Sequence, residues 1–408
     1  MFKKQDKNLI VSLDIGTSKI AALVGQVSDD LIEVIGFGTH PSHGLKRGVV
    51  VNIESTVQSI HRAIEEAELM SGCNIHSAYT GIAGGHIRSL NSHGMVAIRN
   101  REVYQSDIDR VIDAAKAVAI PADQQILHIL PQEFVIDNQE GVREPIGMSG
   151  VRLEAKVHIV TGGVSATQNI SKCVQRCGLE VGDIILEQIA SSQAVLTDDE
   201  KELGVCILDI GGGTTDIAIF TDGAIRHTKV IPIAGDHVTN DIAVALRTPL
   251  QNAELIKIQY ASVLPDSVNA EQTIDVPGVA KRPFKQVHKL ALAQVVGARY
   301  EELFTLVKTE LHRTGFDDVI PAGIVLTGGA SKVHGALELA ESIFAMPVRL
   351  GVPQHVSGLR DVHDNPGYAT GVGLLMHGYH NQMRNVPVNL NSQNSLWQRM
   401  KAWFQGNF

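Results

Sequence analysis

The chain has 408 residues, of which 44% are hydrophobic and only 4% aromatic, so it is long enough for two or more domains with largely aliphatic cores. Its net charge of -9 argues against a nucleic-acid-binding protein, because affinity for a duplex depends on cationic contacts to phosphate. No stretch approaches the roughly 18 apolar residues of a membrane-spanning helix. The four cysteines do not form a zinc-binding set.

The hydrophobic pattern of the first half predicts three strands over residues 9–40 and then a half-buried helix from Ile53 to about Gly72. Residues 84–162 combine strand-like segments with one helix, which predicts a compact α+β unit inserted into the chain. A helix, a strand and a second helix complete this half.

The second half begins near residue 203 with another set of strands, followed by two helices and then a long helix that includes residues 292–307. A strand at 324–326 leads into a glycine pair and a further helix. Residues 381–394 contain five asparagines and no packed pattern, so we expect a linker there.

Two glycine-containing turns repeat in outline along the chain. The pattern of residues 13–23, and likewise of 208–218, predicts an apolar strand ending in aspartate, a tight turn and a second strand. Glycine lets the backbone approach a ligand closely, and amides in such a turn can bind an anion. Asp14 and Asp209, at the ends of the first strands, are expected to hold Mg²⁺ through water. Two such units, 195 residues apart, predict a duplicated fold with a phosphate cleft between its halves.

Further residues complete the expected nucleotide site. Gly328 and Gly329 separate a strand from a helix, where a nucleobase or ribose can lie against bare backbone. Glu254 and Lys257 share one face of a helix and are expected to bond ribose hydroxyls; the alternative is a solvated ion pair. The phosphate-binding set consists of Gly16, Thr17, Ser18, Lys19, Gly211, Gly212, Gly213, Thr214, Thr215 and Gly235.

This order of features resembles the actin superfamily of nucleotide-binding proteins. Within it, several segments are similar to the FtsA family of bacterial cell-division proteins, and the resemblance covers about residues 9–380 plus the tail. The segments are residues 209–216 (Asp-Ile-Gly-Gly-Gly-Thr-Thr-Asp), 324–330 (Ile-Val-Leu-Thr-Gly-Gly-Ala), 202–206 and 223–232.

The resemblance implies an α/β, actin-like duplicated ATPase fold with an inserted α+β subdomain and a C-terminal amphipathic helix. The first domain core would comprise residues 1–83, 163–202 and 361–380, with the inserted subdomain at 84–162. The second core would comprise 203–245 and 314–360, with an outer, partner-docking subdomain at 246–313, the linker at 381–394 and the helix at 395–408.

The resemblance also implies ligands and partners. These are ATP with Mg²⁺ in the central cleft, further copies of the chain in a head-to-tail filament, and later division proteins at the inserted subdomain. The C-terminal peptide of the division tubulin FtsZ is expected on the subdomain with the long helix, where Arg299 and Glu302 are the candidate contacts. Ordinary surface charge is the alternative for each of them.

Catalysis would require a group that orients the attacking water in line with the γ-phosphate. Gln193 lies where the resemblance implies a water-orienting glutamine, and Asp216, seven residues after Asp209, is a second candidate. Gln193 is alternatively a polar surface residue of its helix. We expect ATP binding with slow or absent turnover, rather than a dedicated metabolic enzyme.

The segment 395–408 has one apolar face, formed by Leu396, Trp397, Met400, Trp403 and Phe404. Both tryptophans of the chain are here, basic residues flank the face, and tryptophan favours the lipid–water interface. We expect an interfacial helix that binds anionic lipid and places the protein on the cytoplasmic face of the cell membrane at the division site. The alternative is a helix docked on the protein itself or in a partner groove.

Three other functions are known for proteins with the superfamily fold and are the alternatives here. A small-molecule kinase needs a base beside an acceptor hydroxyl, and no such motif is recognisable. A heat-shock-type chaperone needs a peptide-binding domain after the ATPase, for which too few residues follow. A pilus-assembly adaptor would share the fold but has less reason for an amphipathic tail.

Overall fold

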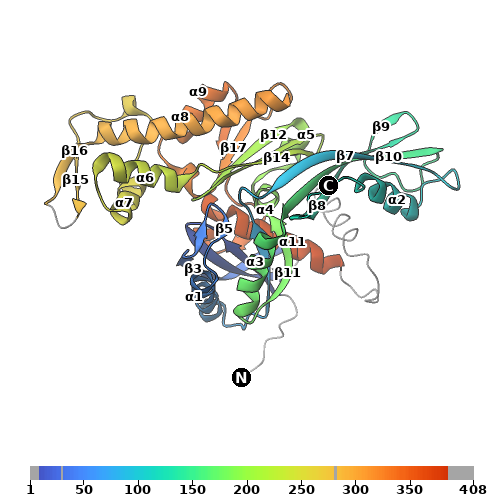
Figure 1. The fold of residues 1–408 in the computed structure, drawn as a ribbon, viewed down its shortest axis with the longest axis horizontal. Coiled ribbons are helices and arrows are strands. Elements are labelled where there is room, and N and C mark those ends of the chain that lie inside the picture. The colour runs from blue at the N-terminus through green and yellow to red at the C-terminus, as the bar shows by residue number, and fades with distance from the viewer. Residues whose placement is uncertain (1–8, 29–30, 280–282, 385–408) are drawn as a thin grey trace.

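The computed structural model describes residues 9–28, 31–279 and 283–384, and Figure 1 shows how its sheets and helices are arranged. The first sheet has the strand order β11-β6-β1-β2-β3-β19. Its strands are β1 (Leu9–Ile15), β2 (Lys19–Ser28), β3 (Leu31–Pro41), β6 (Ser77–Ile82), β11 (Glu180–Leu186) and β19 (Val356–Gly358). The helices of this half are α1 (Ile53–Ser71), α3 (Val164–Arg176), α4 (Glu187–Val195), α5 (Asp198–Leu203), α10 (Arg360–His363) and α11 (Ala369–Arg384). A short ribbon of β4 (Leu45–Lys46) and β5 (Val49–Val50) and the 3-10 turn η5 (Pro366–Tyr368) complete it.

The second sheet has the order β14-β13-β12-β17-β18. Its strands are β12 (Val205–Ile210), β13 (Thr215–Thr221), β14 (Ala224–Ile231), β17 (Ile324–Thr327) and β18 (Val348–Leu350). The helices are α6 (Gly235–Leu246), α7 (Leu250–Tyr260), α8 (Lys289–Thr314) and α9 (Ala336–Phe344), with 3-10 turns η2 (Pro265–Ser267) and η4 (Gly329–Lys332). A hairpin of β15 (Thr273–Val276) and β16 (Lys285–His288) forms one end of the molecule in Figure 1.

The two sheets share one five-strand topology, to which the first sheet adds β19, and this confirms the expected duplication. In each sheet three consecutive strands pair antiparallel, β1-β2-β3 and β12-β13-β14. In each, the first of these strands also pairs in parallel with a later strand, β6 or β17. The turn between the first two strands therefore emerges at an equivalent place in both halves.

Local sequence explains why α1 forms and where it lies. Asn52 caps the helix by accepting a hydrogen bond from the Ser55 N–H at 3.0 Å, and Gly72 ends it in the left-handed conformation at φ 70°. Gly38 of β3 allows close packing, because a Cβ there would lie 2.0 Å from the Ala63 carbonyl oxygen. α1 and α3 contact each other, whereas α4 and α11 pack together between the two halves.

The inserted unit is a separate α+β body with its own core. Its sheet has the order β7-β10-β8-β9, formed by β7 (Arg88–Ala97), β8 (Gln124–Ile136), β9 (Gln139–Val142) and β10 (Arg152–Gly163). Helix α2 (Gln105–Ala115) packs on this sheet through buried side chains such as Val111 and Ile112. In Figure 1 the unit lies at the opposite end from the β15-β16 hairpin, beside the second sheet.

The expected linker is corrected at its start, because α11 continues to Arg384. Asparagine content suggested a break at residue 381, but the helix extends through these positions. The remainder of that linker and the amphipathic segment 395–408 lie outside the described residues. Among the described residues, none of the helices combines the length and hydrophobicity needed to cross a membrane.

Candidate functional site

A cavity of about 620 Å³ lies between the two halves, and both glycine turns line it. Almost all of the residues expected at a nucleotide are brought together here. The predicted residues that line the cavity are Asp14, Gly16, Thr17, Ser18, Lys19, Asp209, Gly211, Gly212, Gly213, Thr214, Asp216, Gly235, Glu254, Lys257, Gly328 and Gly329.

The two glycine turns face each other at close range. A Cβ on Gly212 would lie 2.2 Å from the Ser18 hydroxyl oxygen, and one on Gly213 would lie 2.5 Å from that of Thr17. The Ser18 hydroxyl also donates to the Asp236 carboxylate of α6 at 3.1 Å. The lack of side chains at the second turn therefore allows the first turn to approach it.

Gly328 is required by both its conformation and its surroundings. Its φ is 85°, and a Cβ would lie 2.4 Å from Oδ1 of Asp209 and 2.5 Å from the Ile210 carbonyl oxygen. Its own N–H donates to the Pro366 carbonyl oxygen at 3.1 Å. The third glycine motif is thus packed directly behind the aspartate of the second turn.

Besides Glu254, which is paired with Lys257, four carboxyl groups line the cavity: Asp14, Asp209, Asp216 and Glu187. Burial raises the pKa of Asp14 to about 6, partly offset by Lys19, and burial together with Asp209 raises the pKa of Asp216 to about 8. Burial and the neighbouring aspartates raise the pKa of Glu187 well above its usual value. The site therefore favours any ligand that brings positive charge to these groups.

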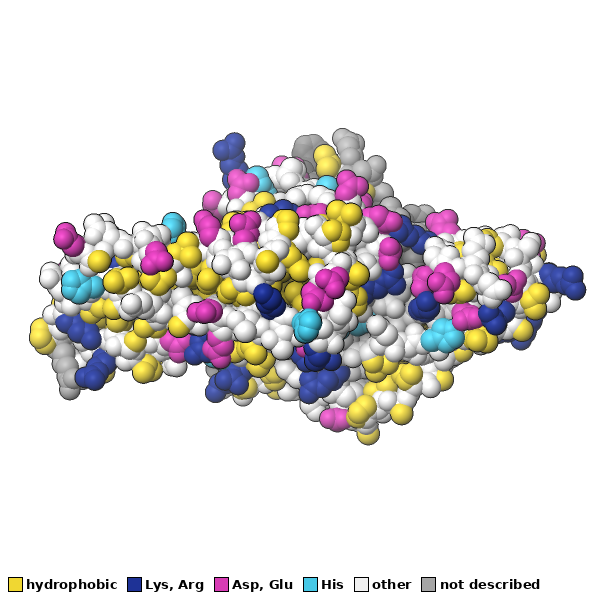
Figure 2. All heavy atoms as spheres, turned by 90° about the horizontal axis from the view of Figure 1, so that it is seen from above, with side chains coloured by type: hydrophobic (Ala, Val, Ile, Leu, Met, Phe, Trp, Pro, Cys, Tyr) yellow, Lys and Arg dark blue, Asp and Glu magenta, His cyan; other side chains and the backbone are white. Residues whose placement is uncertain are grey.

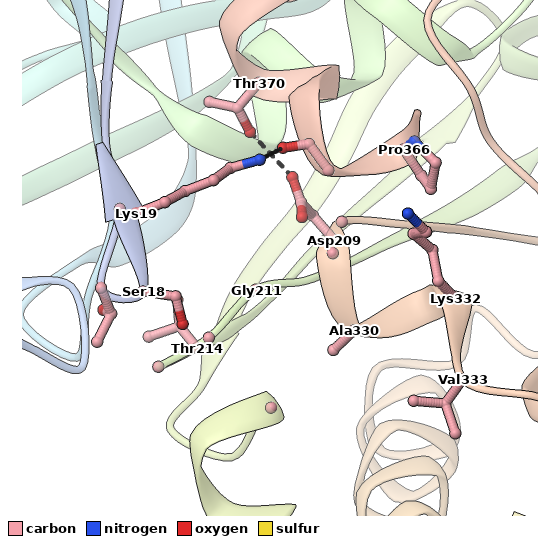
Figure 3. A pocket seen from close by; sticks show the side chains of 18 of the residues that line it. Ser18, Lys19, Asp209, Gly211, Thr214, Ala330, Lys332, Val333, Pro366 and Thr370 are labelled. Carbon is pink, nitrogen blue, oxygen red and sulfur yellow. Dashed lines mark hydrogen bonds between the residues drawn. The ribbon is translucent and has the colours of Figure 1, made fainter. Parts of the chain in front are cut away.

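Lys19 crosses from the first turn to the segment before α11. Its amino group donates to the Gly367 carbonyl oxygen at 2.6 Å and lies 3.4 Å from the centre of the Tyr368 ring. Figure 3 shows Lys19 reaching towards Asp209 and Thr370, whose hydroxyl donates to the Asp209 carboxylate at 3.1 Å. Burial lowers the pKa of Lys19 to about 8.

Glu254 and Lys257 form an ion pair at 2.7 Å, and both line the cavity. The Lys257 amino group also donates to the Gly235 carbonyl oxygen at 3.1 Å and to the Thr239 hydroxyl at 2.8 Å. The pair is therefore anchored to the start of α6 rather than only exposed to solvent. A role towards ribose stays a prediction.

Two of the expected residues do not line the cavity. Thr215 is fully buried, and its hydroxyl donates to the Ile233 carbonyl oxygen at 2.7 Å, so it serves the junction between β14 and α6. Gln193 borders a different cavity, together with Leu196 and Lys201. It lies six residues beyond Glu187 on α4, a rotation of about 240° around the helix, so the two residues lie on different faces of α4. A water-orienting role for Gln193 stays a prediction.

The sequence analysis missed several lining residues. Glu187 is the first residue of α4 and directly follows β11, so an acidic residue at a strand end was the available signal. Lys332 follows the third glycine motif by three residues and lines the cavity with the segment 365–367 and Thr370. These residues reach the cavity through the folding of the chain, and none of them belongs to a glycine motif that the sequence reveals.

Arg299 and Glu302, the expected partner contacts, border a surface groove between α6 and α8. The guanidinium of Arg299 is held by both oxygens of Asp241, at 2.6 and 3.0 Å, and also bonds Glu302. Val244, which is 70% exposed, gives the groove an apolar side. Figure 2 views the molecule from the side of α8 and shows acidic, basic and hydrophobic side chains interspersed on this face.

Comparison with known proteins decides the family. A family model described as cell division protein FtsA matches residues 206–373, and one described as an SHS2 domain inserted in FtsA matches residues 84–161. Cell division protein FtsA of Pseudomonas aeruginosa is 66% identical over the full length of both chains. The chain belongs to the FtsA family of cell division proteins. FtsA of Escherichia coli K12 is 44% identical, again over both full lengths.

Solved structures confirm the actin-like fold. The PilM-PilN type IV pilus biogenesis complex contains a chain with a TM-score of 0.66 at 15% identity, covering 90% of this chain and 98% of that one. MreB5 of Spiroplasma citri bound to ADP has a TM-score of 0.56 at 16% identity, covering 93% and 100%. The expected inserted α+β unit is likewise confirmed, as the SHS2 domain of the FtsA family.

The raised pKa of Asp216 predicts how stability depends on pH without a ligand. The folded protein keeps this proton up to about pH 8, whereas the unfolded chain releases it near pH 4, so this group lowers the free energy of unfolding as pH rises between those values. Asp216→Asn should remove this dependence and gain about 2–5 kcal/mol over wild type between pH 5 and 8. Urea unfolding of nucleotide-free protein measures it; parallel pH profiles would contradict the assignment.

Proposed function

We propose that this member of the FtsA family binds ATP in the central cavity and links a division filament to the membrane. The observation that carries the proposal is the meeting of two glycine turns, each following a buried aspartate, at one cavity. The structures of Spiroplasma citri MreB5 bound to ADP and to AMPPNP support a nucleotide at the corresponding fold position.

The residues of the cavity fit ATP with Mg²⁺. The amides and hydroxyls of the two turns suit phosphate oxygens, and Gly328 and Gly329 leave bare backbone for the adenosine side. Within the described residues no three His, Cys, Asp or Glu side chains converge to hold a metal by themselves. Asp14 and Asp209 would instead hold Mg²⁺ through water, with phosphate supplying further oxygens. The bound metal would neutralise the clustered carboxylates.

Slow turnover remains our expectation for the bound ATP. Asp216 lines the cavity, its Oδ2 accepts the Thr214 hydroxyl at 2.9 Å, and its Oδ1 is buried without a partner among the described residues. Glu187 faces the same space. Both carboxyls can orient a water molecule, but their raised pKa values make them weak bases while they are protonated.

Asp209→Asn should weaken Mg-ATP binding about tenfold or more, because the site loses a full negative charge beside the metal while keeping its shape. Anisotropy of a fluorescent ATP analogue measures the affinity in the presence of Mg²⁺. Asp222→Asn, in the turn between β13 and β14, is the matched control and should bind normally. Equal affinity of Asp209→Asn and wild type would remove Asp209 from the site.

The groove between α6 and α8 is the proposed docking site for the C-terminal peptide of FtsZ. Its apolar side is formed by Val244, Val295 and Ala298, and the Arg299 side chain is fixed at its rim by Asp241. A short peptide with one apolar face and a carboxylate would match this combination. The inserted unit is proposed to receive later division proteins, and further copies of the chain to assemble head to tail.

Arg299→Glu should weaken binding of the FtsZ C-terminal peptide about tenfold, because it places three acidic groups at the rim of the groove. Arg313→Glu, on the same helix but paired with Glu310 away from the groove, is the charge-matched control. Fluorescence anisotropy of labelled peptide gives both affinities. A similar loss in both variants would indicate long-range charge, and no loss in either would refute the docking site.

Residues 395–408 are the proposed membrane anchor, which would place the protein on the cytoplasmic face of the membrane at the division site. The apolar face has four or five side chains, and each would contribute roughly 1.5–3 kcal/mol to membrane binding if it were fully buried. Each basic residue adds about 1 kcal/mol at an anionic surface. Ordering costs offset much of this, so one copy should bind reversibly, and a filament would gain avidity from many copies.

Trp403→Glu should abolish co-sedimentation with anionic liposomes, because it removes an interfacial aromatic ring and adds a charge to the apolar face. Gln405→Glu adds the same charge without removing an apolar side chain and should reduce binding only slightly. Retention of the Trp403→Glu variant on liposomes at the wild-type level would exclude the anchor.

A further inference from the structure

The inserted unit contacts both walls of the central cavity, although the chain inserts it only into the first half. We propose that two of its histidines, His128 and His158, are positioning residues for the nucleotide site, one on each wall. This inference rests on the proposed nucleotide binding, because it assigns the inserted unit a role in that affinity.

The first contact fixes the backbone beside Glu187. His128 of β8 accepts a hydrogen bond at Nε2 from the Leu186 N–H at 3.0 Å. Leu186 ends β11, and the next residue, Glu187, lines the cavity. On its other side Glu187 is packed against Gly81, where a Cβ would lie 2.9 Å from the Glu187 Cγ. The position of this carboxyl is therefore set in part from the inserted unit.

The second contact holds the edge strand of the second sheet. His158 of β10 is buried, with Nδ1 2.6 Å from the Asn91 side-chain oxygen and Nε2 2.9 Å from the Thr228 hydroxyl. The Asn91 amide nitrogen donates to the Arg226 carbonyl oxygen, which sets its orientation. His158 therefore donates from Nδ1 and accepts the Thr228 hydroxyl at Nε2.

Thr228 is close to the cavity along the strand ladder. It lies in β14, two residues before Val230, which pairs with Asp216 of β13. Asp216 lines the cavity, and β14 continues into the segment that carries Gly235. A shift of β14 is thus transmitted through one strand pair to a carboxyl of the site.

Other polar contacts hold the same edge. The Ser89 hydroxyl donates to the Thr228 carbonyl oxygen at 3.0 Å, and the Gln132 amide donates to that of Ile225 at 2.9 Å. Arg143 donates to the Asp222 carbonyl oxygen at 2.9 Å. Because β14 is the edge strand, Ser89 and Gln132 of the inserted unit bond backbone carbonyls on its outer side, and Arg143 bonds the turn that precedes it. Figure 1 shows β7 and β8 beside β14.

The inserted unit is therefore joined to both walls by directional hydrogen bonds. Burial lowers the pKa of His158 to about 3, so this contact keeps one protonation state at neutral pH. If the two walls of the cavity move relative to each other when nucleotide binds, the contact of His128 or that of His158 must change. By linkage, a ligand of the inserted unit that favours one arrangement changes nucleotide affinity, and nucleotide changes affinity for that ligand by the same factor.

The experiment compares Mg-ATP affinity, measured with a fluorescent analogue, in full-length His128→Leu and His158→Leu. Each should bind about fivefold more weakly than wild type, a typical size for coupling between sites. His128→Gln and His158→Gln should recover most of the affinity, because glutamine offers both an acceptor and a donor. His93→Leu is the matched control in the same unit, since His93 is exposed and pairs with Glu154; it should bind normally.

A wild-type protein that fails to bind Mg-ATP would overturn the proposed function and this inference together. Wild-type binding with unchanged affinity in both leucine variants would overturn the inference alone. If the leucine variants do not fold, hydrogen exchange on wild type decides. Adding Mg-ATP should then slow exchange in β8, β10 and β14, and an unchanged exchange pattern in these three strands would refute the inference.

Discussion

A concentration of buried carboxyl groups at the junction between the two halves is the constraint around which the central cavity is built. Asp14, Asp209, Asp216 and Glu187 all line one cavity, and Lys19 is the cation that most offsets the burial of Asp14. Burial of carboxylates without matching cations costs free energy, and this cost raises the pKa values of Asp14, Asp216 and Glu187. In the proposed function, Mg²⁺ brought with the nucleotide would interact with carboxylates of both halves at once, which would give the two halves a physical reason to bind one ligand together.

The duplicated topology explains why these groups meet. In both sheets the next-to-last residue of the first strand is an aspartate, and glycines at the second turn let the two turns approach closely. The remaining contacts come from segments far along the chain: Gly328 packs behind Asp209, and Thr370 at the start of α11 bonds it. The inserted unit adds contacts on the outer side of each wall, through His128 and His158. The cavity is thus supported from several independent elements.

The sequence allowed the fold and most of the cavity to be predicted because the relevant signals are local. A strand, an aspartate and a glycine turn can be recognised within about a dozen residues, and the repetition of this motif implies a duplicated fold. Glu187 and Thr370 carry no such motif, since they reach the cavity only through the packing of α4 and α11. The role of Gln193 stays a prediction, because the resemblance located α4 but did not fix which of its faces meets the phosphate turns, and Gln193 borders a different cavity. The end of α11 was misplaced because asparagine content is a weak signal against helix continuation.

The most direct test of the account is isothermal titration calorimetry of purified, nucleotide-stripped protein with ATP, with and without Mg²⁺. The account predicts saturable binding of one ATP per chain with Mg²⁺ and much weaker binding when the metal is chelated, because the carboxylates then repel the phosphates. The absence of any binding heat under either condition, or equal affinity with and without the metal, would contradict the claim that a metal–nucleotide complex joins the two halves.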